Sequence, residues 1–209
     1  PWEDNIDAME AAEQAQGTNI VALIDDYGVG NSRLLKIQHD PVVPSTSIIS
    51  PELDDSYAVI PPSGEVNMAS ADTLSAFINF SSSQFPADRY ILILWGHGAG
   101  WYGLCPDGTD LLNLVELKEA TTQAASSIGS KLDMVVVDAC AEATVEVMAQ
   151  LQGSVDFLVE ADLTGYVRLG RVQVSLFQIV ILLYQDLFLL QQPLFYLREL
   201  LLVQAFTSS

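Results

Sequence analysis

Residues 91–101 read ILILWGHGAGW, and this stretch decides the fold class. The unbroken apolar run that starts it is short and follows Tyr90, which is typical of a β-strand buried on both faces. A strand of this kind requires helices on both sides of its sheet. The glycine-rich continuation ends the strand and places His97 just beyond it.

Two other apolar runs have the same character, at residues 19–25 (NIVALID) and 132–137 (LDMVVV). We expect residues 20–25, 90–95 and 132–137 to form neighbouring parallel strands. Residues 34–38 are expected to return beside the first strand as a hairpin. Helical spacing and capping residues predict helices over 7–16, after Ser70, from about Leu114, and over 141–151. Strands that alternate with helices indicate an α/β fold with a largely parallel sheet.

The second candidate functional residue, Cys140, follows the strand at 132–137. Functional residues of open α/β sheets lie beyond the carboxyl ends of the strands, where His97 and Cys140 are both expected. A thiolate is the nucleophile, and a nearby imidazole activates the thiol and then protonates the leaving amine. A helix that begins directly after Cys140 would favour the thiolate. The backbone amides of Gly98 and Cys140 are the expected oxyanion donors.

Each of these residues also has a simpler explanation. A cysteine after a strand is usually part of the core, and a single histidine is usually structural. The pair is more specific than either residue, because both follow buried strands. The sequence therefore favours a cysteine peptidase over a structural role.

The blocks at residues 91–101 and 135–140 (VVVDAC) resemble the two active-site blocks of the clostripain family of cysteine peptidases, and the similarity covers roughly residues 2–166. That family belongs to the caspase-like clan. The resemblance implies a caspase-like, three-layer α/β/α sandwich with a mostly parallel central sheet. It also implies endopeptidase activity through a thiol acyl-enzyme. The residues 141–142 replace the apolar pair that usually follows the nucleophile.

The resemblance also implies specificity for Arg, and less so Lys, before the scissile bond. Asp138 matches the acid that is thought to line the specificity pocket of the family. A carboxylate in a partly buried pocket pairs with a guanidinium and rejects neutral side chains. The alternative role for Asp138 is a turn or helix-capping acid. The alternative function for the chain is a catalytically inactive, caspase-like binding or structural module.

The composition restricts the partners. The formal net charge is −19, and half of the residues are hydrophobic, which excludes a disordered chain. This charge repels nucleic acid and anionic membranes and leaves cationic segments as the natural electrostatic partners, and solubility or adaptation to a salty or acidic medium explains it equally well. The resemblance implies that the partners are polypeptide substrates with Arg or Lys at the cleavage site. The chain begins at Pro1 without a cleavable signal, as after processing, and we expect an extracellular, secreted location.

We expect one peptidase domain over residues 1–170 and an apolar C-terminal segment, 171–209, packed on the same domain. Polar residues interrupt this segment, so membrane association is not expected. The two cysteines are too few for a disulfide scaffold, and Cys105 is expected to be structural. No metal site or cofactor is predicted, although the acidic loop 107–110 could host calcium.

Overall fold

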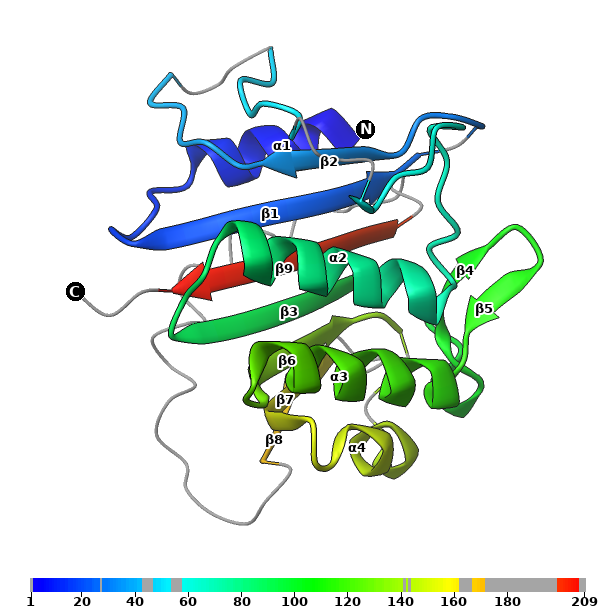
Figure 1. Ribbon diagram of the computed structural model, residues 1–209. Helices are drawn as coiled ribbons and strands as arrows, with labels where there is room; N and C mark the ends of the chain where they lie inside the picture. Colours follow the sequence, from blue (N-terminus) through cyan, green and yellow to red (C-terminus); the bar gives the residue numbers. More distant parts are fainter. Residues whose placement is uncertain are drawn as a thin grey trace.

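The computed structural model of the chain describes residues 2–26, 28–42, 47–53, 58–140, 142, 144–161, 167–171 and 199–206. In this part of the chain, the central sheet has the strand order β2-β1-β9-β3-β6-β7-β8 (Figure 1). The sheet strands are β1 (Thr18–Asp25), β2 (Arg33–Lys36), β3 (Arg89–Gly96), β6 (Leu132–Asp138), β7 (Val155–Ala161), β8 (Val167–Arg171) and β9 (Glu199–Phe206). The helices are α1 (Trp2–Ala11), α2 (Ala71–Gln84), α3 (Leu114–Ile128) and α4 (Val145–Leu151). A separate hairpin joins β4 (Leu104–Asp107) to β5 (Asp110–Leu112).

The directions of the strands confirm the α/β class and correct one expected neighbour. β3, β6 and β7 are parallel neighbours, as residues 90–95 and 132–137 predicted. β1 has the same direction, but β9 lies between β1 and β3 and is antiparallel to both. The expectation that residues 20–25 neighbour residues 90–95 is therefore wrong. Periodicity along one strand contains no information on a strand from the far end of the chain that pairs between two others.

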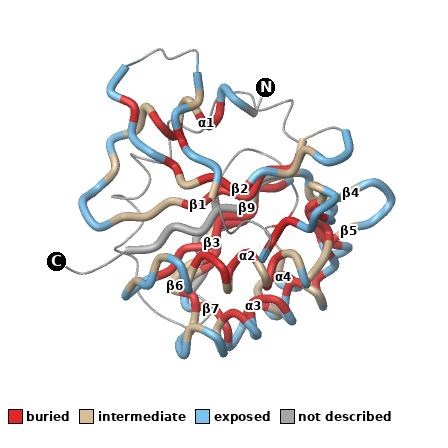
Figure 2. Tube along the Cα trace, turned by 45° about the horizontal axis from the view of Figure 1, so that its top comes forward, coloured by how far each residue is buried: buried red, intermediate tan, exposed pale blue. Residues whose placement is uncertain are grey.

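Helices pack on both faces of the sheet. One large apolar cluster joins α2, α3 and α4 to the face of the sheet that carries Leu92, Leu94 and Val135. A second cluster joins Ile6 and Met9 of α1 to the opposite face. Figure 2 shows the resulting arrangement, with buried strands in the middle and exposed residues on the outer surfaces of the helices. This gives the three layers that the doubly apolar strand at 90–95 requires.

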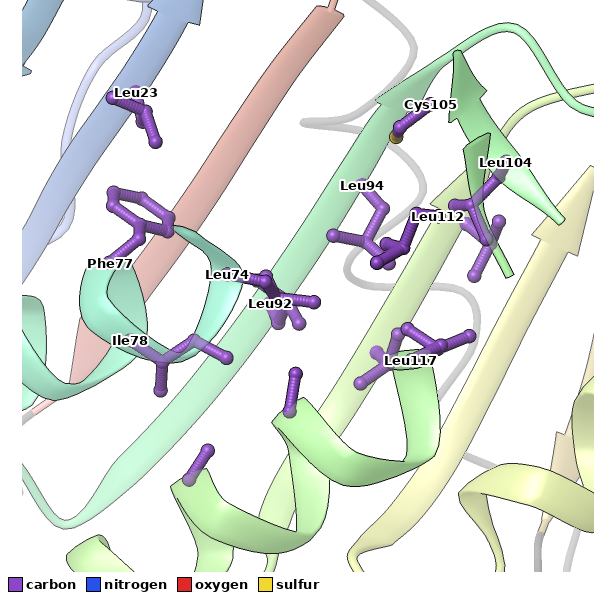
Figure 3. Close-up of a cluster of buried hydrophobic side chains, with 14 of the residues drawn as sticks. Leu23, Leu74, Phe77, Ile78, Leu92, Leu94, Leu104, Cys105, Leu112 and Leu117 are labelled. Atoms are coloured by element: carbon purple, nitrogen blue, oxygen red, sulfur yellow. The ribbon is translucent and has the colours of Figure 1, made fainter. Parts of the chain in front are cut away.

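The larger cluster holds the edge of the sheet that positions the candidate site. Figure 3 shows Leu92 and Leu94 of β3 among side chains from α2, α3 and the β4–β5 hairpin. Both leucines are fully buried. Truncating a buried leucine to alanine typically costs about 2–5 kcal/mol, so this packing fixes the end of β3 firmly.

The helix boundaries follow local capping residues. Ser70 caps α2 by accepting a hydrogen bond from the amide of Asp72, as expected. Asn113 and Glu116 form a capping box at the start of α3, which begins at Leu114 as predicted. The first helix ends at Ala11, earlier than the predicted residue 16. The strand expected at 34–38 is β2, antiparallel to β1.

The C-terminal part of the chain contributes β9 to the sheet. Residues 172–198, which contain most of the apolar segment, lie outside the described residues. Within the residues that are described, no helix is long and apolar enough to cross a membrane.

Candidate active site

The register of β3 and β6 brings His97 and Cys140 to the same edge of the sheet. The last paired residues of these parallel strands are Trp95 and Asp138. His97 follows Trp95 by two positions, and Cys140 follows Asp138 by two positions. Both side chains are exposed to solvent. The expected placement beyond the carboxyl ends of two adjacent strands is therefore found.

A close backbone approach joins the two segments beyond these strands. A Cβ atom on Gly98 would overlap the carbonyl oxygen of Cys140 and lie 2.5 Å from Oε1 of Glu142. Only glycine leaves room for this approach, because any other residue carries that Cβ. The residue directly after His97 thus lies against the backbone of Cys140.

The loop of His97 is held by the β4–β5 hairpin. The amide of Cys105 donates to the carbonyl of His97 at 2.9 Å, and the amide of Ala99 donates to the carbonyl of Gly103 at 2.8 Å. These bonds flank a β-bridge between Gly98 and Leu104. The bridge does not use the amide of Gly98, which is the amide expected to donate to an oxyanion.

The two cysteines have opposite environments. Cys140 is exposed, and Cys105 is buried in the core between β3 and the β4–β5 hairpin (Figure 3). Neither forms a disulfide. Cys105 is therefore a core residue, as expected, and Cys140 is the thiol that a substrate can reach.

The helix expected at residues 141–151 begins later than predicted. α4 starts at Val145, and Thr144 is its N-cap. Cys140 therefore lies before the helix and not at its first residue, and α4 has only 7 residues. A helix dipole acts within about one turn of its end, so the favourable effect on a thiolate that was expected from a helix starting directly after Cys140 is weakened.

Asp138 is the last residue of β6 and is exposed. The neighbouring chain nevertheless partly desolvates its carboxyl group, which raises its pKa. Neighbouring residues of a strand point to opposite faces, so Asp138 faces away from the side of Val137. An acid at this edge can accept a cationic group, whose charge would offset the desolvation.

Two buried glutamates that the sequence analysis did not assign lie beside the site. Glu142 is fully buried, and its Oε1 accepts a hydrogen bond from the amide of Gly100 at 2.8 Å. Burial raises the pKa of Glu142 to about 7, although the hydrogen bond from the amide of Gly100 and the nearby amide of Ala99, which itself donates to the carbonyl of Gly103, act to lower it. Burial, together with the charge of Glu142, raises the pKa of Glu160 to about 8.

Glu160 lies on β7, level with Val137 of β6. Parallel partners in register point to the same face, so Glu160 and Asp138 point to opposite faces of the sheet. Among the described residues, no hydrogen-bond partner meets either carboxylate oxygen of Glu160 or Oε2 of Glu142. The available signal in the sequence was an acid inside an apolar segment, FLVEA in the case of Glu160.

The acidic loop 107–110 is engaged in structural hydrogen bonds. Asp107 accepts from the amide of Met68 at 2.9 Å, and Asp110 accepts from the side chain of Asn67 at 2.7 Å. The bond from Asn67 is the main cause of a lowered pKa of Asp110. The residues that the structure describes contain no group of three or more His, Cys, Asp or Glu residues that could hold a metal ion.

The sequence profile of the clostripain family (peptidase C11) matches residues 2–165. This chain belongs to the clostripain family. The match contains the whole candidate site, including the segments that follow β3 and β6. No curated protein sequence matches the chain.

Solved structures of C11 proteases share the fold of this family member. A secreted C11 cysteine protease from Bacteroides thetaiotaomicron, bound to an irreversible peptide inhibitor, has a TM-score of 0.56 and 21% identity. An inactive zymogen C11 protease from Parabacteroides distasonis has a TM-score of 0.55 and 20% identity. Both alignments cover 76% of this chain and 42% of the other chain. The chain thus spans less than half the length of these relatives, and the likeness confirms the caspase-like fold.

The segment at residues 156–166, which follows α4, is described only as far as Ala161. Its first part forms β7 and supplies Glu160. The remaining residues, 162–166, lie outside the described residues. Of the predicted site residues, His97, Gly98, Asp138 and Cys140 all lie at one edge of the sheet.

Proposed function

We propose that this chain is a cysteine endopeptidase that cleaves polypeptides after basic residues, with His97 and Cys140 as its catalytic pair. One observation carries the proposal. Gly98 packs on the carbonyl of Cys140, at the ends of two strands that are paired up to Trp95 and Asp138. Membership of the clostripain family supports the same chemistry. A thiol and an imidazole supply both nucleophile and base, so the proposal needs no metal or organic cofactor.

In the first half of the reaction, His97 takes the proton of the Cys140 thiol. The thiolate attacks the carbonyl carbon of the scissile bond, and the carbonyl oxygen becomes an oxyanion. The amides of Gly98 and Cys140 stabilise this oxyanion by donating to it. His97 then gives its proton to the leaving amine, the C–N bond breaks, and a thioester remains on Cys140.

In the second half, His97 acts as a base toward water. The water attacks the thioester carbonyl and gives its proton to the imidazole. The same amides stabilise the second oxyanion. When the C–S bond breaks, the thiolate of Cys140 is restored, and the new carboxyl product leaves. The imidazolium returns its proton to this thiolate, which restores the neutral thiol and imidazole for a new cycle.

Asp138 supplies the preference for basic residues. Its carboxyl group lies at the sheet edge, two residues before Cys140, and its desolvation raises its pKa. A guanidinium that bonds both carboxylate oxygens would relieve this desolvation. Lys offers a point charge without the planar fork, so Arg is expected to be the better substrate.

The test combines substrate profiling with labelling of the nucleophile. Peptides with Arg, Lys, Leu or Asp before the cleaved bond are offered to the protein, and an arginyl chloromethyl ketone is used to label Cys140. The expected result is hydrolysis in the order Arg, Lys, then little for Leu or Asp, with one label per chain on Cys140. A protein that neither hydrolyses these peptides nor takes the label at Cys140 would instead be an inactive, caspase-like binding module.

The expected partners are polypeptides with exposed Arg or Lys. The net charge of −19 favours such segments and disfavours nucleic acid. We also propose a secreted protein, in line with the relative from Bacteroides thetaiotaomicron that is described as secreted. Detection of the protein in culture supernatant, with a cytoplasmic marker absent, would support this location.

A further inference from the structure

Glu142 occupies an unusual place for a buried acid. It lies two residues after Cys140, and its side chain is fully buried. Burying a charged group is unfavourable unless hydrogen bonds or charges compensate. The compensation comes from the loop of His97. The amide of Gly100 donates to Oε1 at 2.8 Å, and the amide of Ala99 also interacts with the carboxylate.

This contact joins two segments that are distant in sequence. Glu142 and Gly100 are 42 residues apart, on the two loops that follow β3 and β6. Gly98 also packs against the segment that contains Cys140 and Glu142. A Cβ at this position would meet both the carbonyl of Cys140 and the side chain of Glu142. The loop of His97 is thus held on the Cys140 segment by one carboxylate and one glycine.

We propose that Glu142 is a positioning residue, which holds the loop of His97 against the segment of Cys140 so that imidazole and thiol meet. The inference rests on the proposed function, since it assigns the purpose of the contact to the catalytic pair. Hydrogen bonds to a carboxylate are about twice as strong as those between neutral groups, and the charge therefore matters. A misplacement of about 1 Å can cost roughly a hundredfold in rate.

The ionisation of Glu142 provides a readout that a purely structural contact lacks. Its pKa of about 7 means that protonation near neutral pH weakens the contact with Gly100. The charged group that interacts with it is Glu160 on β7, and the titratable side chains of Cys140 and His97 belong to the two segments that the contact joins. The charge of Glu142 in turn raises the pKa of Glu160, so the two carboxyls titrate as a coupled pair.

Two variants of Glu142 and one matched control separate positioning from stability. Glu142→Leu keeps the size but removes the acceptor, and Glu142→Gln keeps an acceptor without the charge. Glu10→Leu is the control, because Glu10 is also fully buried and accepts from the amides of Ile49 and Ser50, on the other side of the molecule. Steady-state kinetics on an Arg peptide from pH 5.5 to 9 and amide hydrogen exchange of Gly100 are measured for each protein.

For Glu142→Leu we expect kcat to fall by roughly a hundredfold with KM within about twofold, and the Gly100 amide to exchange faster. Glu142→Gln should recover most of the kcat at pH 8, but should lack the component of the pH profile near 7. Glu10→Leu should lower the melting temperature and leave kcat and the Gly100 amide of the folded protein unchanged.

Wild-type kcat together with unchanged Gly100 exchange in Glu142→Leu would overturn the inference and leave the proposed function intact. An inactive wild type that does not label at Cys140 would overturn the proposed function and, with it, the positioning role. If Glu142→Leu does not fold, the pH profile and Gly100 exchange of Glu142→Gln decide. A profile and exchange rate identical to those of the wild type would then refute the inference.

Discussion

Two regions of the molecule use the same device, a buried glutamate that binds backbone amides of a loop. On the α1 side, Glu10 accepts from Ile49 at 3.1 Å and from Ser50 at 2.7 Å. At the sheet edge, Glu142 accepts from Gly100 at 2.8 Å. Both side chains are fully buried.

The difference lies in what surrounds each carboxylate. Both oxygens of Glu10 accept hydrogen bonds from the amide of Ile49. Within the described part of the chain, Oε2 of Glu142 has no partner, and the nearby carboxylate of Glu160 has none either. A carboxylate whose oxygens all accept hydrogen bonds makes a loop rigid. A pair of buried carboxyl groups that lacks some of these hydrogen bonds remains sensitive to protonation. Glu10 on the α1 side therefore stabilises the fold. At the sheet edge, Glu142 and Glu160 are carboxyl groups whose charge can change near neutral pH.

The largest expected effect lies at the catalytic pair itself. Cys140→Ala and His97→Ala should each lower kcat/KM by about a thousandfold or more, because each removes a group that takes part directly in the proposed mechanism. Melting temperatures should stay within a degree or two, since both side chains are exposed. Cys105→Ala is the matched cysteine control and should stay active if folded. Hydrolysis that survives in Cys140→Ala would remove Cys140 as the nucleophile.

The next effect concerns specificity. Asp138→Asn should lower kcat/KM for Arg peptides by roughly a hundredfold, since losing the charge partner of a desolvated cation costs a few kcal/mol. Peptides with Leu before the cleaved bond should change little. The measurement is a peptide library at moderate ionic strength, where exposed charges beyond about 10 Å are screened. An unchanged preference for Arg would assign the pocket to another acid.

A smaller effect is expected from the backbone approach at Gly98. Gly98→Ala should lower kcat by roughly tenfold, because the added Cβ would push the His97 loop away from Cys140. Gly129→Ala is the control at the end of α3, where a Cβ meets nothing within 4 Å but the φ angle is +80°. That variant should lose about 1 kcal/mol of stability and no activity. Equal losses of activity in both variants would show a general effect of destabilisation.

The smallest effect is on stability and pH. Burial raises the pKa of Glu160 from 4.5 to about 8, so the folded protein retains a proton between these values that the unfolded chain releases. The folded state therefore becomes less stable as pH rises through this range. Glu160→Gln should raise the melting temperature by a few degrees at pH 9 and change little at pH 4. The exposed Glu146→Gln should show no such pH-dependent gain, and an equal gain in both variants would contradict the prediction.

Much of the fold was predictable from local patterns. Doubly apolar runs correctly located β1, β3 and β6, and Ser70 and Leu114 marked the starts of two helices. The start of α4 was placed too early, because Ala141 and Glu142 have helix-forming composition. In the structure, Glu142 is instead committed to the amide of Gly100, and α4 begins at Val145.

Residues that are adjacent in the chain specify the α/β class, the family and the positions of His97 and Cys140. Apolar runs set the strands, and the residues directly after them set the candidate chemistry. The position of β9 between β1 and β3, and the contact of Glu142 with the loop of His97, emerge only in the folded chain. Both features depend on contacts between distant segments, and a local pattern does not specify which distant partner a strand edge or a buried carboxylate will meet.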